Sequence, residues 1–204
     1  HVRSRRQRQM CIRDRLNIMG KDLFTTEIFA QFDPEFLSSA EENLRYELLS
    51  NPKDNKKLEQ LATLLYHKRD YDGAINLYLK IIDNDETARK YAFLGYLYFE
   101  KDDYQNAISY FEKSLDIDPK NAFVYFLLGN SYSRIGRVID AVTNYDLAIF
   151  LNFDIYKAHV DFAQKYEQMG LFQRALKEYI IAYEIDPRNK EIKNKIESLK
   201  SQLR

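Results

Sequence analysis

A pattern that returns every 34 residues runs through most of this chain. Gly95 and Gly129 hold equivalent places in two successive copies of the pattern, and Ala163 holds that place in a third. A weaker copy precedes them, with Ala62 at the corresponding position. A fixed period of this length is typical of stacked-repeat proteins, in which each unit buries its apolar face only against its neighbours. The period therefore predicts an extended array of similar units, and such arrays usually work as binding surfaces.

Each copy is predicted to fold into two helices, because apolar residues recur at spacings of three and four and so share one stripe of a helix. In the second copy we expect helices over residues 88–101 and 104–117. Asp118-Pro119 ends that copy, since proline cannot continue a helix. Gly136 and Gly170 fall in the matching turns of the next two copies, where positive φ costs glycine little. The register positions of the second copy are Tyr91, Leu94, Gly95, Tyr98, Ala107, Phe111 and Pro119.

Small residues mark the place where the two helices of a copy approach each other. Glycine inside a helix costs about 0.5–1 kcal/mol relative to alanine, which a close approach of the partner helix would justify. Ala107 and Ala141 occupy the facing register on the second helix, and aromatic residues such as Phe111 are expected to fill the volume between units. We expect Ala141→Leu to overpack the hairpin by about 1–3 kcal/mol.

These motifs resemble the tetratricopeptide repeat family: Tyr-x2-Leu-Gly-x2-Tyr, then Ala-x3-Phe, then Pro. The resemblance covers Asn55 to Asn189 and implies an all-α, right-handed superhelical solenoid of helix-turn-helix repeats. It places four units at 55–87, 88–121, 122–155 and 156–189. The first unit departs from the pattern, with Ala62 for glycine and Glu86 for proline, and it is one residue short. The third unit has Phe153 where proline is usual.

The two flanks are predicted to be helical. Residues 190–204 read as one amphipathic helix that caps the array, since a solenoid must shield its end faces. In the N-terminal flank, 16–54, Asp33 is expected to cap a helix that begins at Pro34 and runs to Leu49. A short apolar helix is expected before it, over Leu23 to Phe32. This flank is interpreted as an N-terminal cap, with a docking helix or half of a degenerate repeat as the alternatives.

The first fifteen residues hold six arginines and one acid, Asp14. One interpretation is a basic arm for nucleic acid or an anionic membrane. The other follows from the run RRQRQMCIRD, Arg5 to Asp14, which resembles the conceptual translation of a transposase-type sequencing adapter. On that interpretation the native sequence begins after Arg15. The remainder then has 25 basic and 30 acidic residues (31 less 6, and 31 less 1), so the net charge changes from 0 to −5.

Composition and motifs argue against several function classes. The single cysteine, Cys11, excludes an internal disulfide framework, and no apolar run is long enough to span a bilayer. No secretory signal follows the basic N-terminus, so a cytoplasmic location is predicted. His159 takes a register that is aromatic in the other copies and is interpreted as a packed core residue, while His67 is alone. We therefore predict no catalytic residues, no metal site and no cofactor.

The family resemblance also implies where a ligand binds. In such proteins the first helix of each unit lines a concave groove, through positions 2, 5, 9, 12 and 13 of the unit. Tyr66 and His67 hold such positions in the first unit. A groove for a C-terminal carboxylate is not expected, because Glu59 and Thr63 stand where that clamp needs lysine and asparagine. The predicted partner-binding residues are Arg89, Tyr96, Phe99, Phe123, Phe126, Asn130, Arg134, Lys157 and Gln164.

These aromatic residues have a second interpretation, in which they pack against the next helix or a flank and bind no ligand. The favoured function is a non-enzymatic scaffold that binds a peptide or helix of a partner protein in the groove. The alternative is a protein associated with nucleic acid or a membrane through a genuine basic N-terminal arm. Without the first fifteen residues the chain is weakly acidic, which argues against nucleic-acid binding, because proteins that bind nucleic acid usually carry a basic stripe. An enzyme is the third and least favoured class.

Overall fold

The structure of the chain, a computed structural model, describes residue 28 and residues 32–83 and 86–203. Within these ranges all regular elements are α-helices, except that Ile28 has 3₁₀ geometry, and no strand is present. The all-α class and the helix-turn-helix units predicted from the sequence are confirmed. The basic leader at 1–15 and most of the short apolar helix expected over 23–32 lie outside the described residues. The chain divides into two compact units, residues 1–146 and 147–204.

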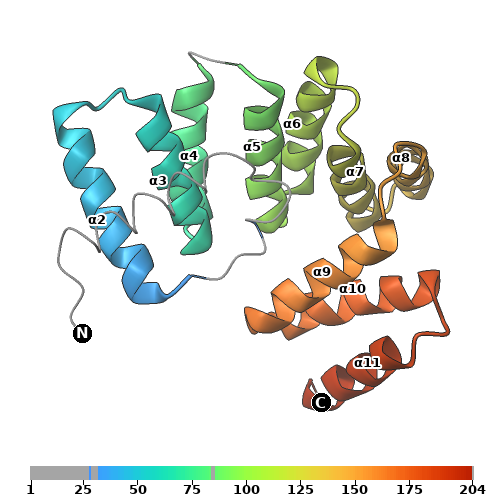
Figure 1. The fold of residues 1–204 in the computed structure, drawn as a ribbon. Helices are drawn as coiled ribbons and strands as arrows, with labels where there is room; N and C mark the ends of the chain where they lie inside the picture. The colour runs from blue at the N-terminus through green and yellow to red at the C-terminus, as the bar shows by residue number, and fades with distance from the viewer. Residues whose placement is uncertain (1–27, 29–31, 84–85, 204) are drawn as a thin grey trace. The chain divides into compact units, whose positions relative to one another are not determined.

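The first unit is a series of helices that pack in chain order (Figure 1). Helix α2 packs on α3, α3 on α4, α4 on α5, α5 on α6, and α6 on α7. The helices are α2 (Pro34–Ser50), α3 (Asn55–His67), α4 (Tyr71–Ile82), α5 (Ala88–Glu100), α6 (Tyr104–Ile117), α7 (Ala122–Arg134) and α8 (Val138–Phe150), which crosses the border between the units. The helix predicted over 104–117 matches α6, and the one predicted over 88–101 matches α5 to within a residue.

The second unit contains the end of α8 and three further helices. They are α9 (Ile155–Gln168), α10 (Phe172–Ile185) and α11 (Lys190–Gln202). Helix α10 packs on both α9 and α11. Ile192, Ile196 and Leu199 of α11 are buried, as the amphipathic pattern of this segment predicted.

Short polar side chains begin most of these helices. An Asp, Asn or Thr before the helix accepts a hydrogen bond from a backbone N–H of the first turn, which would otherwise have no partner inside the helix. Asp33 accepts from the Glu35 backbone at 2.8 Å, with Pro34 at the first position, which confirms the predicted start of α2. The capping residues are Asp33, Asp54, Asp70, Thr87, Asp103, Asn121, Asp154 and Asn189.

One residue in each turn between the two helices of a repeat adopts a left-handed backbone conformation. Gly136 and Gly170 have φ of +79° and +71°, as predicted for these turns. The first two repeats place Arg69 and Asp102 in the equivalent turns, with φ of +63° and +62°. A side chain at such φ carries a steric cost that glycine avoids. The four repeats therefore share one turn geometry, although only the third and fourth have glycine, the residue that fits it best.

The third repeat ends without the proline of its neighbours. Phe153 stands in place of proline and keeps its backbone N–H, which donates to the Ala148 carbonyl at 3.0 Å. Asn152 before it has φ of +63° and donates to the Ile149 carbonyl at 2.8 Å. This left-handed residue and its two hydrogen bonds satisfy the last carbonyls of α8. The departure from the repeat pattern therefore changes how α8 stops.

Glycine makes room inside the hairpins of the middle repeats. A β-carbon at Gly129 would lie 2.5 Å from Cε1 of Tyr145, a distance that no real β-carbon keeps. The close approach predicted at this register is thus present. Its partner is the ring of Tyr145 on α8, the second helix of the same repeat, and this ring contact was not predicted from the sequence.

Candidate interaction site

The predicted groove aromatics are largely buried. Tyr96 and Phe126 have no exposed surface, and Phe99 is 4% exposed. Tyr96 and Phe99 stack with their ring centroids 6.4 Å apart, and Phe99 also meets Tyr104 edge-on at 5.6 Å. Phe126 lies 6.3 Å from the Tyr145 ring of the same repeat. These contacts support the interpretation in which the aromatics pack against neighbouring elements, so they do not form an open trough here.

A chain of hydroxyl groups links the first two repeats at the predicted groove register. The Tyr66 hydroxyl on α3 lies 3.2 Å from the Tyr96 hydroxyl on α5. The Tyr96 hydroxyl donates to the Glu100 carboxylate at 2.5 Å, and that carboxylate is buried. Burial, first of all, and the nearby negative charge of Glu100 raise the pKa of Tyr66 well above its ordinary value. Tyr66 therefore stays protonated and acts as a donor.

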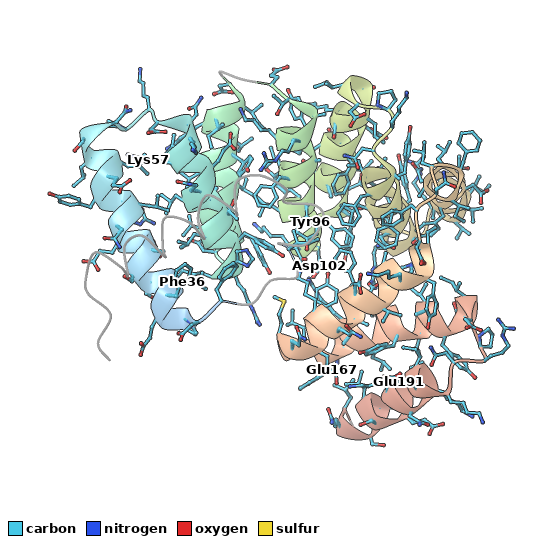
Figure 2. All side chains as sticks on the ribbon, viewed as in Figure 1. Phe36, Lys57, Tyr96, Asp102, Glu167 and Glu191 are labelled. Atoms are coloured by element: carbon cyan, nitrogen blue, oxygen red, sulfur yellow. The ribbon has the colours of Figure 1, made fainter. Side chains whose placement is uncertain are left out.

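The N-terminal flank contacts this same chain of hydroxyls. The Tyr66 hydroxyl donates to the backbone carbonyl of Ile28 at 3.2 Å, and Ile28 is buried. Phe32 meets His67 edge-on, with ring centroids 4.7 Å apart, and stacks with Phe36 at 5.7 Å. Tyr96 and Phe36, labelled in Figure 2, come from α5 and α2. Residues before the first repeat therefore lie against Tyr66 and His67, the predicted groove positions at the end of α3.

The remaining predicted residues of the first unit are polar or half-buried. Asn130 is buried and accepts a hydrogen bond from the Tyr145 hydroxyl at 2.7 Å. Arg89, Phe123 and Arg134 are half-buried, and Phe123 stacks with Phe126 of the same helix at 6.0 Å. Arg89 and Arg134 thus keep part of their surface open to solvent at the predicted register.

An ion pair joins the first helices of the first two repeats. Lys90 of α5 lies 3.5 Å from the Glu59 carboxylate of α3, and the Lys90 side chain is almost entirely buried. Glu59 is one of the residues that argued against a carboxylate clamp. In the structure its charge is met by a lysine of the chain itself.

The two predicted residues of the fourth repeat, Lys157 and Gln164, belong to the second unit. Lys157 is exposed and donates to the Asp161 carboxylate one turn later, at 2.6 Å. This hydrogen bond raises the pKa of Lys157. Gln164 is exposed and lines a cavity of about 390 Å³.

That cavity lies between the fourth repeat and the C-terminal helix. Glu167 at its edge accepts hydrogen bonds from the Tyr179 hydroxyl at 2.9 Å and from Lys195 at 2.8 Å. Burial raises the pKa of Glu167, but the two hydrogen bonds outweigh it and leave the pKa below its ordinary value. Glu167 and Glu191, labelled in Figure 2, come from α9 and α11. The lining residues are Gln164, Glu167, Gln168, Tyr179, Glu191, Ile192 and Lys195.

A buried polar pair lies elsewhere in the fourth repeat. Nδ1 of His159 on α9 lies 2.7 Å from the Glu178 carboxylate on α10, and both side chains are fully or almost fully buried. The prediction that His159 is a packed core residue is confirmed by its burial. Among the described residues, no group of three or more His, Cys, Asp or Glu side chains is placed to hold a metal ion. None of the helices in the described ranges is both long and apolar enough to cross a membrane.

Models of known protein families match the middle of the chain. Two models of the tetratricopeptide repeat match residues 88–121 and 110–143. The matched residues cover the second repeat, α5 and α6, and extend into the third. No curated protein matches the sequence.

Solved structures extend the likeness over more of the chain. A crystal structure of MamA is 22% identical, with a TM-score of 0.58, and the match covers 79% of this chain and 99% of that chain. MamA MSR-1 is 25% identical with a TM-score of 0.58, over 89% of this chain and 98% of that one. The protein TTC0263 of Thermus thermophilus is described as a thermophilic TPR protein. It is 19% identical with a TM-score of 0.53, over 81% and 91% of the two chains. The repeats at residues 88–143 are therefore tetratricopeptide repeats, and they belong to an all-α chain of the tetratricopeptide-repeat fold.

Proposed function

We propose that this chain is a non-enzymatic scaffold that binds a segment of a partner protein on the groove face, meaning the face lined by the first helices of its first three repeats, α3, α5 and α7. Tetratricopeptide repeats are protein-interaction modules, and the repeats found here support that general role. The finer assignment, a groove for a peptide or helix, is supported by one observation above all. The Ile28 carbonyl accepts a hydrogen bond from Tyr66, a residue at a register predicted to face the groove.

The physical basis of such binding is a surface that is ordered before the partner arrives. The helices of the first unit are held by interlocked aromatic side chains, so the scaffold loses little conformational freedom on binding. An amphipathic helix or an extended segment can then place a few anchor side chains against the groove face. Because Tyr96 and Phe126 are buried, they pack beneath this surface and do not touch the partner. The partner would contact the half-buried side chains Phe123, Arg89 and Arg134.

The cations at groove positions suggest the charge of the partner. Arg89 and Arg134 in the first unit are partly exposed. Acidic residues in the partner segment would pair with them and speed its approach at low salt. We therefore propose a partner segment with apolar anchors and acidic flanking residues.

A peptide-display selection tests this function. Full-length protein is used to select binders from a library of random peptides of about 12 residues, and affinities are measured by isothermal titration calorimetry. Arg134→Glu changes a partly exposed groove residue on α7, whereas Lys120→Glu makes the same charge change in an exposed turn. We expect Arg134→Glu to weaken binding about tenfold or more, in the range of an interface hot spot. Selected peptides that bind the two variants equally well would contradict the groove assignment.

A further inference from the structure

We infer that Ile28 and Phe32, which precede α2 and are called the flank below, are built-in occupants of the groove face at the first repeat, and that an external partner docks there by replacing them. This inference rests on the proposed function and adds the chemistry of the partner. The replacing segment needs two bulky apolar side chains four positions apart, the first on a residue whose carbonyl accepts from Tyr66.

The contact of Ile28 is a specific one. Its side chain is 2% exposed, and its carbonyl accepts from Tyr66, which stands at the twelfth position of the first repeat. Tyr66 and Tyr96 are both groove positions, on α3 and α5. The Tyr66 ring also packs against the Tyr96 ring, with centroids 5.7 Å apart. Ile28 therefore sits where two repeats meet on the groove face.

The second anchor is aromatic. Phe32 lies four residues after Ile28 and meets the ring of His67, at the thirteenth position of the first repeat. The Phe32 side chain is half-buried, so it covers the groove position and still borders solvent. Together the two residues cover adjacent groove positions of one helix, α3, and one of these, Tyr66, contacts Tyr96 of α5.

The Tyr66 hydroxyl keeps a hydrogen-bond acceptor when the flank leaves. The Tyr66 hydroxyl carries one proton and has two oxygen neighbours at 3.2 Å, the Ile28 carbonyl and the Tyr96 hydroxyl. The Tyr96 proton goes to Glu100 at 2.5 Å. With the flank in place, Tyr66 donates to Ile28, and without it the same proton can turn to the Tyr96 oxygen. Because a buried donor without a partner is costly, this second acceptor lowers the cost of removing Ile28.

The flank can leave without unfolding the helix that follows it. Helix α2 has its own buried residues, Leu37, Ala40 and Leu44. Glu41 of α2 also accepts from Lys68, after the end of α3, at 2.5 Å. Phe32 precedes the Asp33 cap and so lies outside α2, although its ring stacks with Phe36 of that helix. Displacement therefore requires the exchange of two apolar anchors, one hydrogen bond and this ring stack, while the packing of α2 on α3 stays.

The probe that tests this inference is a fluorescein-labelled synthetic peptide with residues 24–36 of this chain, measured by fluorescence anisotropy. Full-length protein with Ile28→Asp and Phe32→Asp has a weakened flank. The matched control is full-length Leu49→Asp, which adds an acid to an α2 side chain that is 77% exposed. We expect the weakened-flank protein to bind the peptide at least tenfold more tightly than the wild type and the control do. Equal binding by all three proteins, or none by the weakened-flank protein, would overturn the inference.

Two further measurements separate this result from misfolding and from the proposed function. Circular dichroism must show the same helix content in all three proteins, and Ile28→Ala with Phe32→Ala provides a milder pair if the acidic variant unfolds. A peptide carrying Ile28→Asp is expected to lose binding to the weakened-flank protein. If library-selected peptides still depend on Arg134 while the flank peptide shows no preference, the proposed function stands and this inference fails.

Discussion

The ring of Phe111 lies so close to Gly95 that a β-carbon on the glycine would stand 2.7 Å from Cδ1 of the ring. Phe111 is fully buried, so the ring cannot turn away into solvent. Gly95→Ala would raise helix propensity by about 0.5–1 kcal/mol, whereas overpacking a closed site costs about 1–3 kcal/mol. We expect a net destabilisation of about 1 kcal/mol, measured by urea unfolding. Ser109→Ala, at an exposed place on α6, is the control, and a higher urea midpoint for Gly95→Ala would contradict this account.

The left-handed turn residue Arg69 offers a stabilising change. Its φ of +63° is adopted at the equivalent turns by Gly136 and Gly170. Arg69→Gly relieves a steric cost but frees the unfolded chain, so we expect a net gain of up to about 1 kcal/mol. Arg69→Asn should gain less, because asparagine tolerates this conformation only partly. The reverse change, Gly136→Arg, should destabilise the protein in thermal unfolding. An Arg69→Gly protein that melts below the wild type would show that the arginine side chain contributes more than its backbone costs.

The His159–Glu178 pair is expected to be strongly coupled. Removing one member of a buried polar pair leaves the other without its partner and typically costs about 3–5 kcal/mol. We expect His159→Phe alone and Glu178→Leu alone each to destabilise the fourth repeat by about that amount. The double variant should recover much of the loss, because an apolar pair needs no partner. A double-mutant cycle by chemical unfolding measures this, and additive losses would mean that the 2.7 Å contact contributes little.

Buried tyrosines predict how the protein responds to alkali. Burial, first, and the hydrogen bond to Glu112 at 2.7 Å raise the pKa of Tyr132 to about 12. Because the unfolded chain ionises its tyrosines near pH 10, this residue stabilises the fold fully below about pH 10. The contribution is lost as the pH rises from about 10 to about 12. The pKa values of Tyr66, Tyr78 and Tyr179 are also raised, chiefly by burial, so they act in the same direction.

Tyrosinate absorbance and helix content, followed together against pH, test that prediction. We expect these buried tyrosines to ionise only as the helices unfold, and Tyr132→Phe to make the loss of stability with pH less steep. A tyrosinate signal that is complete near pH 10 while the helices persist would show that these side chains are open to solvent.

Local sequence signals predicted the helices well, since they depend on residues a few positions apart. The apolar spacing predicts α6, and Asp33 with Pro34 predicts α2. The Tyr66 contact with Ile28 joins residues 38 positions apart. It was not predictable from the repeat pattern, because Ile28 lies before the first repeat. The cavity edged by Glu167 and Lys195 likewise depends on how α11 docks on the fourth repeat.

The candidate site was predicted less completely than the fold, for a physical reason. The register rule correctly places Tyr96 and Phe126 on first helices, but it takes no account of what covers them. Ile28 and Phe32 were visible in the sequence as part of a short apolar segment interpreted as an N-terminal cap, and that was the available sign that the first repeat is covered. Their placement on Tyr66 and His67 required the structure.

The hydroxyl chain from Ile28 through Tyr66 and Tyr96 to Glu100 also gives the protein an optical reporter. The chain has 16 tyrosines and no tryptophan, so its intrinsic ultraviolet emission comes from tyrosine. A phenol that donates to a carboxylate, as Tyr96 does to Glu100, emits differently from one that donates to a peptide carbonyl. When the flank is removed and no ligand replaces it, the Tyr66 proton turns from the Ile28 carbonyl to the Tyr96 oxygen, and we expect the emission to change. The vacant groove face can therefore be distinguished from the occupied one without attaching any dye.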